Sequence, residues 1–197
     1  MMLGSKVGMT QIFDDTGSRV PVTVLSAGPC YVTQLLNDYN AVQLGYSQMP
    51  EKAVSHSKKK YFEKLQISPL KYLKEFRVPS IGTYEVGQLI TVEQFQVGQT
   101  VQVTSKSIGK GFAGTIKRHH FGRGPMAHGS KNHRAPGSIG ASATPARVFP
   151  GKKMPGRLGG KTVTIKNLTI VDIDTENNLL VVKGSVPGKR GNLVKIA

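Results

Sequence analysis

A run of 78 residues without acidic side chains constrains this chain more than any other feature. Between Glu93 and Asp172 there is no aspartate or glutamate, and residues 94–171 contain 13 lysines and arginines. The other 119 residues contain 14 basic and 11 acidic residues, so most of the net charge of +16 lies in one segment. Because its cations repel one another in water, such a segment becomes ordered against a polyanion, and nucleic acid is the best candidate.

The centre of this run, residues 109–161, is rich in glycine, lysine, arginine and histidine but too poor in apolar residues to form its own core. The rest of the chain is long enough to bury a hydrophobic core. We therefore expect one discontinuous domain, residues 1–108 and 162–197, that carries a basic, glycine-rich extension at residues 109–161.

Composition also argues against a membrane partner. A pI near 10.1 is typical first of nucleic-acid binding and second of binding to an anionic membrane surface. The basic run has no amphipathic stripe and no lipidation motif, no apolar stretch reaches about 18 residues, and the first residues lack a signal-peptide core. The single cysteine, Cys30, is typical of a reducing compartment, and we expect a small residue in a strand or turn rather than a nucleophile.

The residues outside the extension predict a mainly β fold with short helices. Segments rich in β-branched and aromatic residues recur at about ten-residue spacing, which is typical of a barrel or sandwich. Residues 49–79 interrupt this rhythm, and we expect an irregular and helical insertion there, with a short helix at 57–65, strand character returning at 73–78, and a helical turn at 91–95. The strongest strand pair is 162–174 with 179–186, with an irregularity near Asn167. The other predicted strands are residues 6–13, 20–25, 31–36, 41–46, 100–105 and 193–196.

A glycine motif raises the alternative of a nucleotide-dependent enzyme. Gly109, Gly111 and Gly114 match G-x-G-x-x-G after a predicted strand. A dinucleotide site also needs a long helix and an acidic residue about twenty positions later, whereas here the possible helix at 112–120 is short and no acid follows for nearly sixty residues. We expect no cofactor and no small-molecule substrate, and interpret the glycines as places where the backbone approaches phosphates closely.

Histidines in the extension raise the alternative of a metal site. His119, His120, His128 and His133 have no cysteine or carboxylate nearby in sequence, and their spacing matches no zinc motif. The missing carboxylate also argues against acid–base catalysis. We expect no metal and no enzyme, and assign these imidazoles to stacking on bases or hydrogen bonding to 2′-hydroxyls.

The extension is also expected to follow a defined path in RNA instead of behaving as a featureless tail. Apolar residues are spaced among the charges, and five prolines restrict the backbone. Its cations would neutralise phosphates, with Arg118, Arg134 and Arg147 suited to stacking or bidentate contacts. The residues predicted to bind RNA are Lys110, Lys117, Arg118, His119, His120, Arg123, His128, Lys131, His133, Arg134, Arg147, Lys152, Lys153, Arg157 and Lys161.

Ordered motifs along the whole chain resemble those of the large-subunit ribosomal protein three family, the bacterial and plastid branch most closely. The pattern S-x-G-K-G-x-x-G-x-x-x-R spans residues 107–118 and is followed by HGS, HR, PGSIG, TP and GKKMPGR. LGSKVGMTQIF, LKEFRV and NLLVVKGSVPG outside the extension also match. The resemblance implies an elongation-factor-like β-barrel on the subunit exterior, against the 3′-terminal domain of the large-subunit RNA, with a long basic loop inserted between its strands.

The same resemblance implies a structural role in the ribosome of a plastid stroma or bacterial cytoplasm, early in subunit assembly, with large-subunit RNA and neighbouring ribosomal proteins as partners. The loop tip would point toward the peptidyl transferase centre. Relatives often carry a methylated glutamine at this tip, but residues 141–143 contain none, so we expect no such modification. The alternative is a free RNA-binding translation or assembly factor. The residues implied at the tip are Ser138, Ile139, Gly140, Ala141, Ser142, Ala143 and Thr144.

Overall fold

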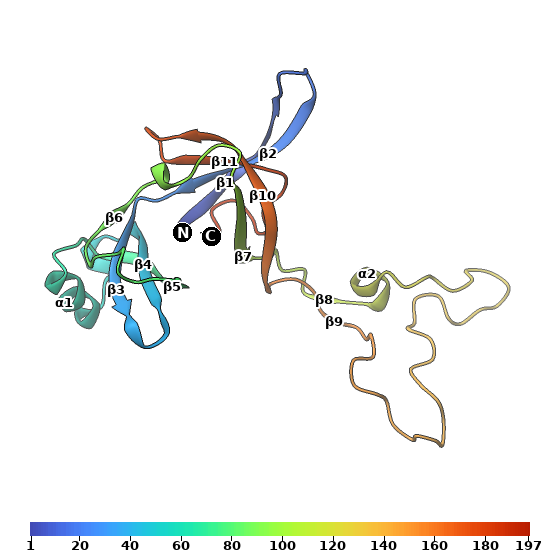
Figure 1. Cartoon of the computed structure of the whole chain (residues 1–197). Helices are drawn as coiled ribbons and strands as arrows, with labels where there is room; N and C mark the ends of the chain where they lie inside the picture. Colours follow the sequence, from blue (N-terminus) through green and yellow to red (C-terminus); the bar gives the residue numbers. More distant parts are fainter. The chain divides into compact units, whose positions relative to one another are not determined.

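The computed structural model describes all 197 residues, apart from the side chain of Tyr39. The chain forms two compact units. One contains Met1–Lys106 and Thr162–Ala197, and the other contains Ser107–Lys161. Figure 1 shows strands in the first unit and mainly irregular chain in the second. The mainly β fold with short helices is thus confirmed.

Six antiparallel strands of the first unit pair in a closed ring, in the order β1-β12-β7-β10-β11-β2. Alternate residues of these strands face the interior, as in β7, where Val101, Val103 and Ser105 are buried and their neighbours are not. The ring closes where β1 pairs with β2 along most of both strands. The six strands are β1 (Met2–Phe13), β2 (Arg19–Ala27), β7 (Thr100–Lys106), β10 (Thr162–Asp174), β11 (Leu179–Lys183) and β12 (Leu193–Ile196).

A second sheet of four strands, in the order β5-β4-β3-β6, corrects two expectations. The strands predicted at 31–36 and 41–46 are not part of the ring, because the chain turns away after β2 at Gly28, whose φ is +81°. Within the segment 49–79, the strand predicted at 73–78 is confirmed but begins earlier, at Leu70, because β5 pairs with β4 from Ala41↔Arg77 to Gln48↔Leu70. The elements here are β3 (Cys30–Leu36), β4 (Ala41–Gln48), β5 (Leu70–Arg77), β6 (Leu89–Ile90), α1 (His56–Lys64) and the 3-10 helices Asn37–Tyr39, Glu51–Ala53 and Val92–Gln94.

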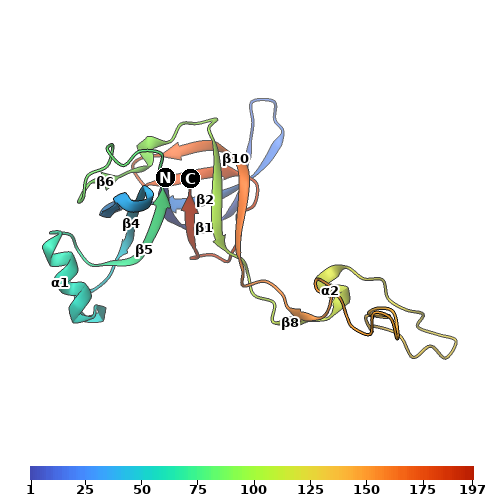
Figure 2. The ribbon, with the colours of Figure 1, turned by 60° about the horizontal axis from the view of Figure 1, so that its bottom comes forward.

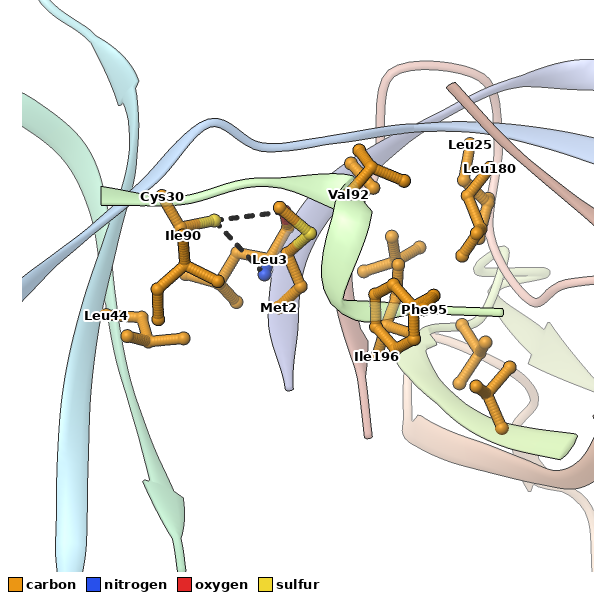
Figure 3. Packing of buried hydrophobic residues seen from close by; sticks show 14 of the residues in the cluster. Met2, Leu3, Leu25, Cys30, Leu44, Ile90, Val92, Phe95, Leu180 and Ile196 are labelled. Carbon is orange, nitrogen blue, oxygen red and sulfur yellow. Dashed lines mark hydrogen bonds between the residues drawn. The ribbon is translucent and has the colours of Figure 1, made fainter. Parts of the chain in front are cut away.

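One hydrophobic core joins the ring to the second sheet. Figure 3 shows Leu3 and Met2 of β1 beside Cys30 and Leu44 of the second sheet. The backbone N–H of Leu3 donates to Cys30 Sγ at 3.4 Å, and the thiol donates to the Leu3 carbonyl at 3.3 Å. Burial raises the pKa of the Cys30 thiol to about 11, so it stays protonated near neutral pH. Cys30 is therefore a packing residue at the start of a strand, as predicted.

Several element boundaries follow from long-range pairing. β1 begins at Met2 instead of residue 6, because residues 2–5 pair with β12. β11 ends at Lys183 instead of residue 186, because Gly184 has a φ of +96° and leaves the strand. The irregularity predicted near Asn167 is confirmed, since the β7–β10 register shifts between Ile165 and Leu168 and Asn167 has a φ of +58°.

Candidate nucleic-acid interface

The unit Ser107–Lys161 is closed at its base by pairing between its two ends. β8 (Phe112–Ala113) pairs with β9 (Gly156–Arg157). Two further hydrogen bonds flank this pair. The Lys110 amide donates to the Leu158 carbonyl at 2.9 Å, and the Ser107 amide donates to the Lys161 carbonyl at 2.8 Å. The extension therefore leaves and returns along one antiparallel ladder.

A short helix follows β8 and carries three of the predicted RNA-binding residues, Lys117, Arg118 and His119 (Figure 2). α2 spans Thr115–His119. The helix expected at 112–120 is therefore shorter, because Phe112 and Ala113 pair with β9 and leave no residues free to extend it at that end. α2 is followed by His120, which caps its end with a left-handed φ of +60° and a hydrogen bond from its amide to the Ile116 carbonyl at 3.0 Å.

Two side chains of α2 contact the same backbone carbonyl, in the chain that leads into β9. Arg118 Nη1 donates to the Met154 carbonyl at 2.7 Å, and His119 Nε2 lies 2.9 Å from the same oxygen. Gly156 makes room for this arrangement, since a Cβ there would collide with the Arg118 guanidinium. Arg118 and His119 are accordingly half-buried. They hold the base of the extension together, a role that no spacing in the sequence indicates.

We expect Gly156→Ala to displace the Arg118 guanidinium and loosen α2. A hydrogen bond from a charged donor contributes about 1.5 kcal/mol or more, which corresponds to roughly tenfold faster local exchange. Hydrogen exchange at the His120 amide measures this effect. Gly122→Ala is the matched control, because a Cβ at Gly122 meets nothing within 4 Å. Unchanged exchange in Gly156→Ala would contradict the proposed role of Arg118.

Beyond its base, the extension is irregular but has local turns. The Gly124 amide donates to the His133 carbonyl at 3.1 Å, and His133 Nδ1 lies 2.9 Å from the Pro125 carbonyl oxygen. A Cβ at Gly124 would collide with the carbonyl oxygen of Asn132. Nearer the expected tip, the amide of Ala146 donates to the Ser142 carbonyl at 3.2 Å. These turns hold the His133 ring and the backbone at Gly124 in a defined geometry.

The predicted RNA-binding residues other than Arg118 and His119 are all exposed. The seven residues implied at the tip, 138–144, are exposed as well, with the Ser138 hydroxyl donating to the Gly140 carbonyl at 3.1 Å. Across the side chains that the structure describes, no three His, Cys, Asp or Glu residues gather as metal ligands would. Apart from Arg118 and His119, the predicted RNA-binding side chains are therefore open to solvent.

Exposed aromatic and apolar side chains accompany these cations. Phe112 is 79% exposed and Phe149 is 58% exposed. The Arg147 guanidinium lies over the Phe149 ring, 5.6 Å from its centroid. Such rings are suitable platforms for unpaired bases. The residue-by-residue prediction omitted them, although an aromatic residue next to a cation in an acid-free segment is a readable signal.

Comparisons with known proteins find the same family that the sequence motifs resemble, and the relatives match nearly the whole chain. A family described as "Ribosomal protein L3" matches residues 82–178. The proteins named "Large ribosomal subunit protein uL3c" of Guillardia theta and Porphyra purpurea are 56% and 58% identical, over 99% and 100% of this chain and 98% of each relative. "Large ribosomal subunit protein uL3" of Prochlorococcus marinus (strain AS9601) is 56% identical over 99% of this chain and 92% of its own length. None of the helices in the described chain is long and apolar enough to span a membrane.

Proposed function

From the premise that this chain belongs to the ribosomal protein L3 family, we propose that residues 109–161 bind large-subunit ribosomal RNA directly. The protein is a structural constituent of the large ribosomal subunit and not an enzyme. It works in ribosomes of the kind found in the plastid stroma or the bacterial cytoplasm.

The observation that carries this proposal is exposed positive charge with no internal counter-charge. Residues 109–161 contain no aspartate or glutamate, and all of their lysines and arginines except Arg118 are exposed. Their repulsion is relieved by phosphates, and each neutralised phosphate releases counterions. The cations position the extension on the RNA backbone, while exposed rings such as Phe149 stack on unpaired bases.

The division of labour inside the extension follows from what each side chain already contacts. Arg118 uses Nη1 on the Met154 carbonyl, so it sets the shape of the base and has other N–H groups left for RNA. Arg134 and Arg147 are exposed, and Arg147 is already stacked on an aromatic ring, as it would stack on a base. We assign the shaped contacts to these arginines and plain phosphate neutralisation to the lysines.

The finer placement rests on the family resemblance. In our proposal the extension joins the RNA early in assembly, against its 3′-terminal domain, and residues 138–144 reach toward the peptidyl transferase centre. The closed ring would be the elongation-factor-like barrel that stays on the subunit exterior. The absence of carboxylates in residues 109–161 supports deep entry into RNA, since each acid would add repulsion from surrounding phosphates.

The proposal is tested by sedimentation of the tagged chain with ribosomes on sucrose gradients at about 1 M salt, where the Debye length is about 3 Å. An extension enclosed by RNA is expected to stay with the large subunit, because its release requires the RNA to open. A surface-bound factor with about ten phosphate contacts would dissociate, since its affinity falls by several orders of magnitude. Recovery of the chain at the top of the gradient would favour the free-factor alternative.

A further inference from the structure

A groove on the first unit lies between β1 and a short loop that precedes β12. We call this loop, residues 187–191, the basic loop, and it is not part of the extension. The walls of the groove include Val7, Met9 and Val24 on one side and Lys189 and Arg190 on the other. Val7 and Met9 are 40% and 52% exposed. Among the described residues that line it, none is acidic. The groove therefore combines apolar surface with unopposed positive charge, outside the extension.

The basic loop is held by hydrogen bonds and by two glycines with positive φ. Gly188 and Gly191, which flank the two cations, have φ values of +96° and +77°. At Gly188 a Cβ would collide with the side chain of Asn192, so the loop depends on glycine there. Arg190 Nε donates to the Val7 carbonyl at 2.8 Å, and the Gly191 amide donates to the Lys6 carbonyl at 2.8 Å. Because the loop is already ordered, a ligand meets little ordering cost on binding.

A third cation lies beneath the loop. Lys6 is 9% exposed, and its Nζ donates to the carbonyls of Val186 at 2.7 Å and Gly188 at 3.2 Å. Its neutral partners hold the ammonium in place without cancelling its charge. Buried charge is weakly screened by salt, so Lys6 strengthens the positive potential at the groove.

The floor of the groove is open because β1 has a glycine at this point. A Cβ at Gly8 would lie 3.8 Å from Arg190 Nε, which is ordinary contact distance, so a larger side chain would occupy the space below the guanidinium. The remaining gap is bounded by an arginine plane, apolar side chains and a lysine. A flat, apolar-faced ligand with attached anionic groups matches these walls.

We propose that this groove binds an unpaired nucleotide of RNA. Its base lies against Val7 and Met9 beside the Arg190 guanidinium, and its flanking phosphates pair with Lys189 and the free N–H groups of Arg190. A duplex does not fit this description, because its bases are stacked inside the helix. The site rests on the proposed function, since the extension brings the protein to RNA, but it is a separate contact.

Photocrosslinking of the full chain to a single-stranded oligoribonucleotide of about ten nucleotides that carries 5-bromouridine tests the site. Crosslinked peptides are mapped by mass spectrometry. We expect one set of crosslinks in residues 109–161 and a second set, from the groove, in residues 6–10 or 186–192. Only the groove crosslinks should be lost in Lys189→Ala/Arg190→Ala. The salt dependence of binding should also fall by about 1.4 logarithmic units per decade, for two phosphate contacts on a single strand. Arg19→Ala/Lys183→Ala removes the same two residue types from exposed positions outside the groove and should keep both sets of crosslinks.

Gly8→Leu fills the groove but keeps Lys189 and Arg190. It should abolish the groove crosslink, while the salt dependence of binding changes by no more than about half a logarithmic unit per decade. Thermal unfolding of each variant identifies any loss of fold. Crosslinks confined to the extension would overturn the groove proposal and leave the proposed function intact. Crosslinks absent from both regions would overturn the proposed function itself. A groove crosslink that survives in Gly8→Leu and in the double variant would also contradict the site.

Discussion

Replacing residues 107–161 by an Asn-Gly turn is expected to leave the first unit folded and to abolish tight RNA binding. Lys106 and Thr162, which would flank the new turn, are already register partners in the antiparallel β7–β10 pair. A two-residue turn of this composition is the favoured connection for such a pair. The ring and its core keep their contacts, whereas about ten phosphate contacts disappear, so the affinity for ribosomal RNA should fall at least about a thousandfold at moderate salt.

Circular dichroism and thermal unfolding report the fold, and filter binding to large-subunit RNA reports the affinity. A full-length variant with glutamine at every lysine and arginine of residues 109–161 is the matched control, because it removes charge but not chain. It should bind as weakly as the shortened protein. Unfolding of the shortened protein would mean that the extension belongs to the core. Retained affinity would assign RNA binding to the first unit.

The second large effect is a loss of stability, expected when buried leucines inside the ring are truncated. Leu25 of β2 and Leu180 of β11 are register partners, and both are fully buried (Figure 3). Truncation of either to alanine should lower the free energy of unfolding by about 2–5 kcal/mol, of a total of about 5–15 kcal/mol. The double variant should be largely unfolded at 37 °C, although the two losses are not additive because they share a cavity.

Urea denaturation of the single and double variants measures these losses. Val24→Ala and Val181→Ala form the control pair, since these residues are also register partners of β2 and β11 but are only half-buried. Each should cost about 1 kcal/mol or less. A leucine pair that costs no more than this valine pair would mean that β2 and β11 do not enclose the core of the ring.

Much of the strand pattern could be predicted because it depends on local alternation. Residues 162–174 form a strand over the predicted span, and the bulge at Asn167 lies where the alternation fails. The partners of each strand could not be predicted. Strands 30–36 and 41–48 pair in a second sheet and not in the ring, and the strand predicted at 73–78 starts at residue 70, where it pairs with β4. Such pairing is decided by contacts between distant residues, which periodicity does not record.

For the candidate interface, too, some features could be predicted from the sequence and others could not. Charge is readable from sequence, and the predicted cations beyond α2 are indeed exposed, but their contacts with RNA stay a prediction. The contacts of Arg118 and His119 with the Met154 carbonyl could not be predicted, because they depend on the approach of a segment some 35 residues away. The groove beside Arg190 was missed for a similar reason, since its walls come from opposite ends of the chain.

The place where the extension joins the ring determines how the protein carries mechanical load. The extension follows β7 and precedes β10, so both strands are joined to it at the same end, and tension directed along their axes pulls both in the same direction. The two strands are not pulled apart from each other, and the load passes in shear to their outer neighbours, β12 and β11. Hydrogen bonds loaded in shear must break together instead of one at a time. The ring therefore resists a pull on the extension that is directed along these strands.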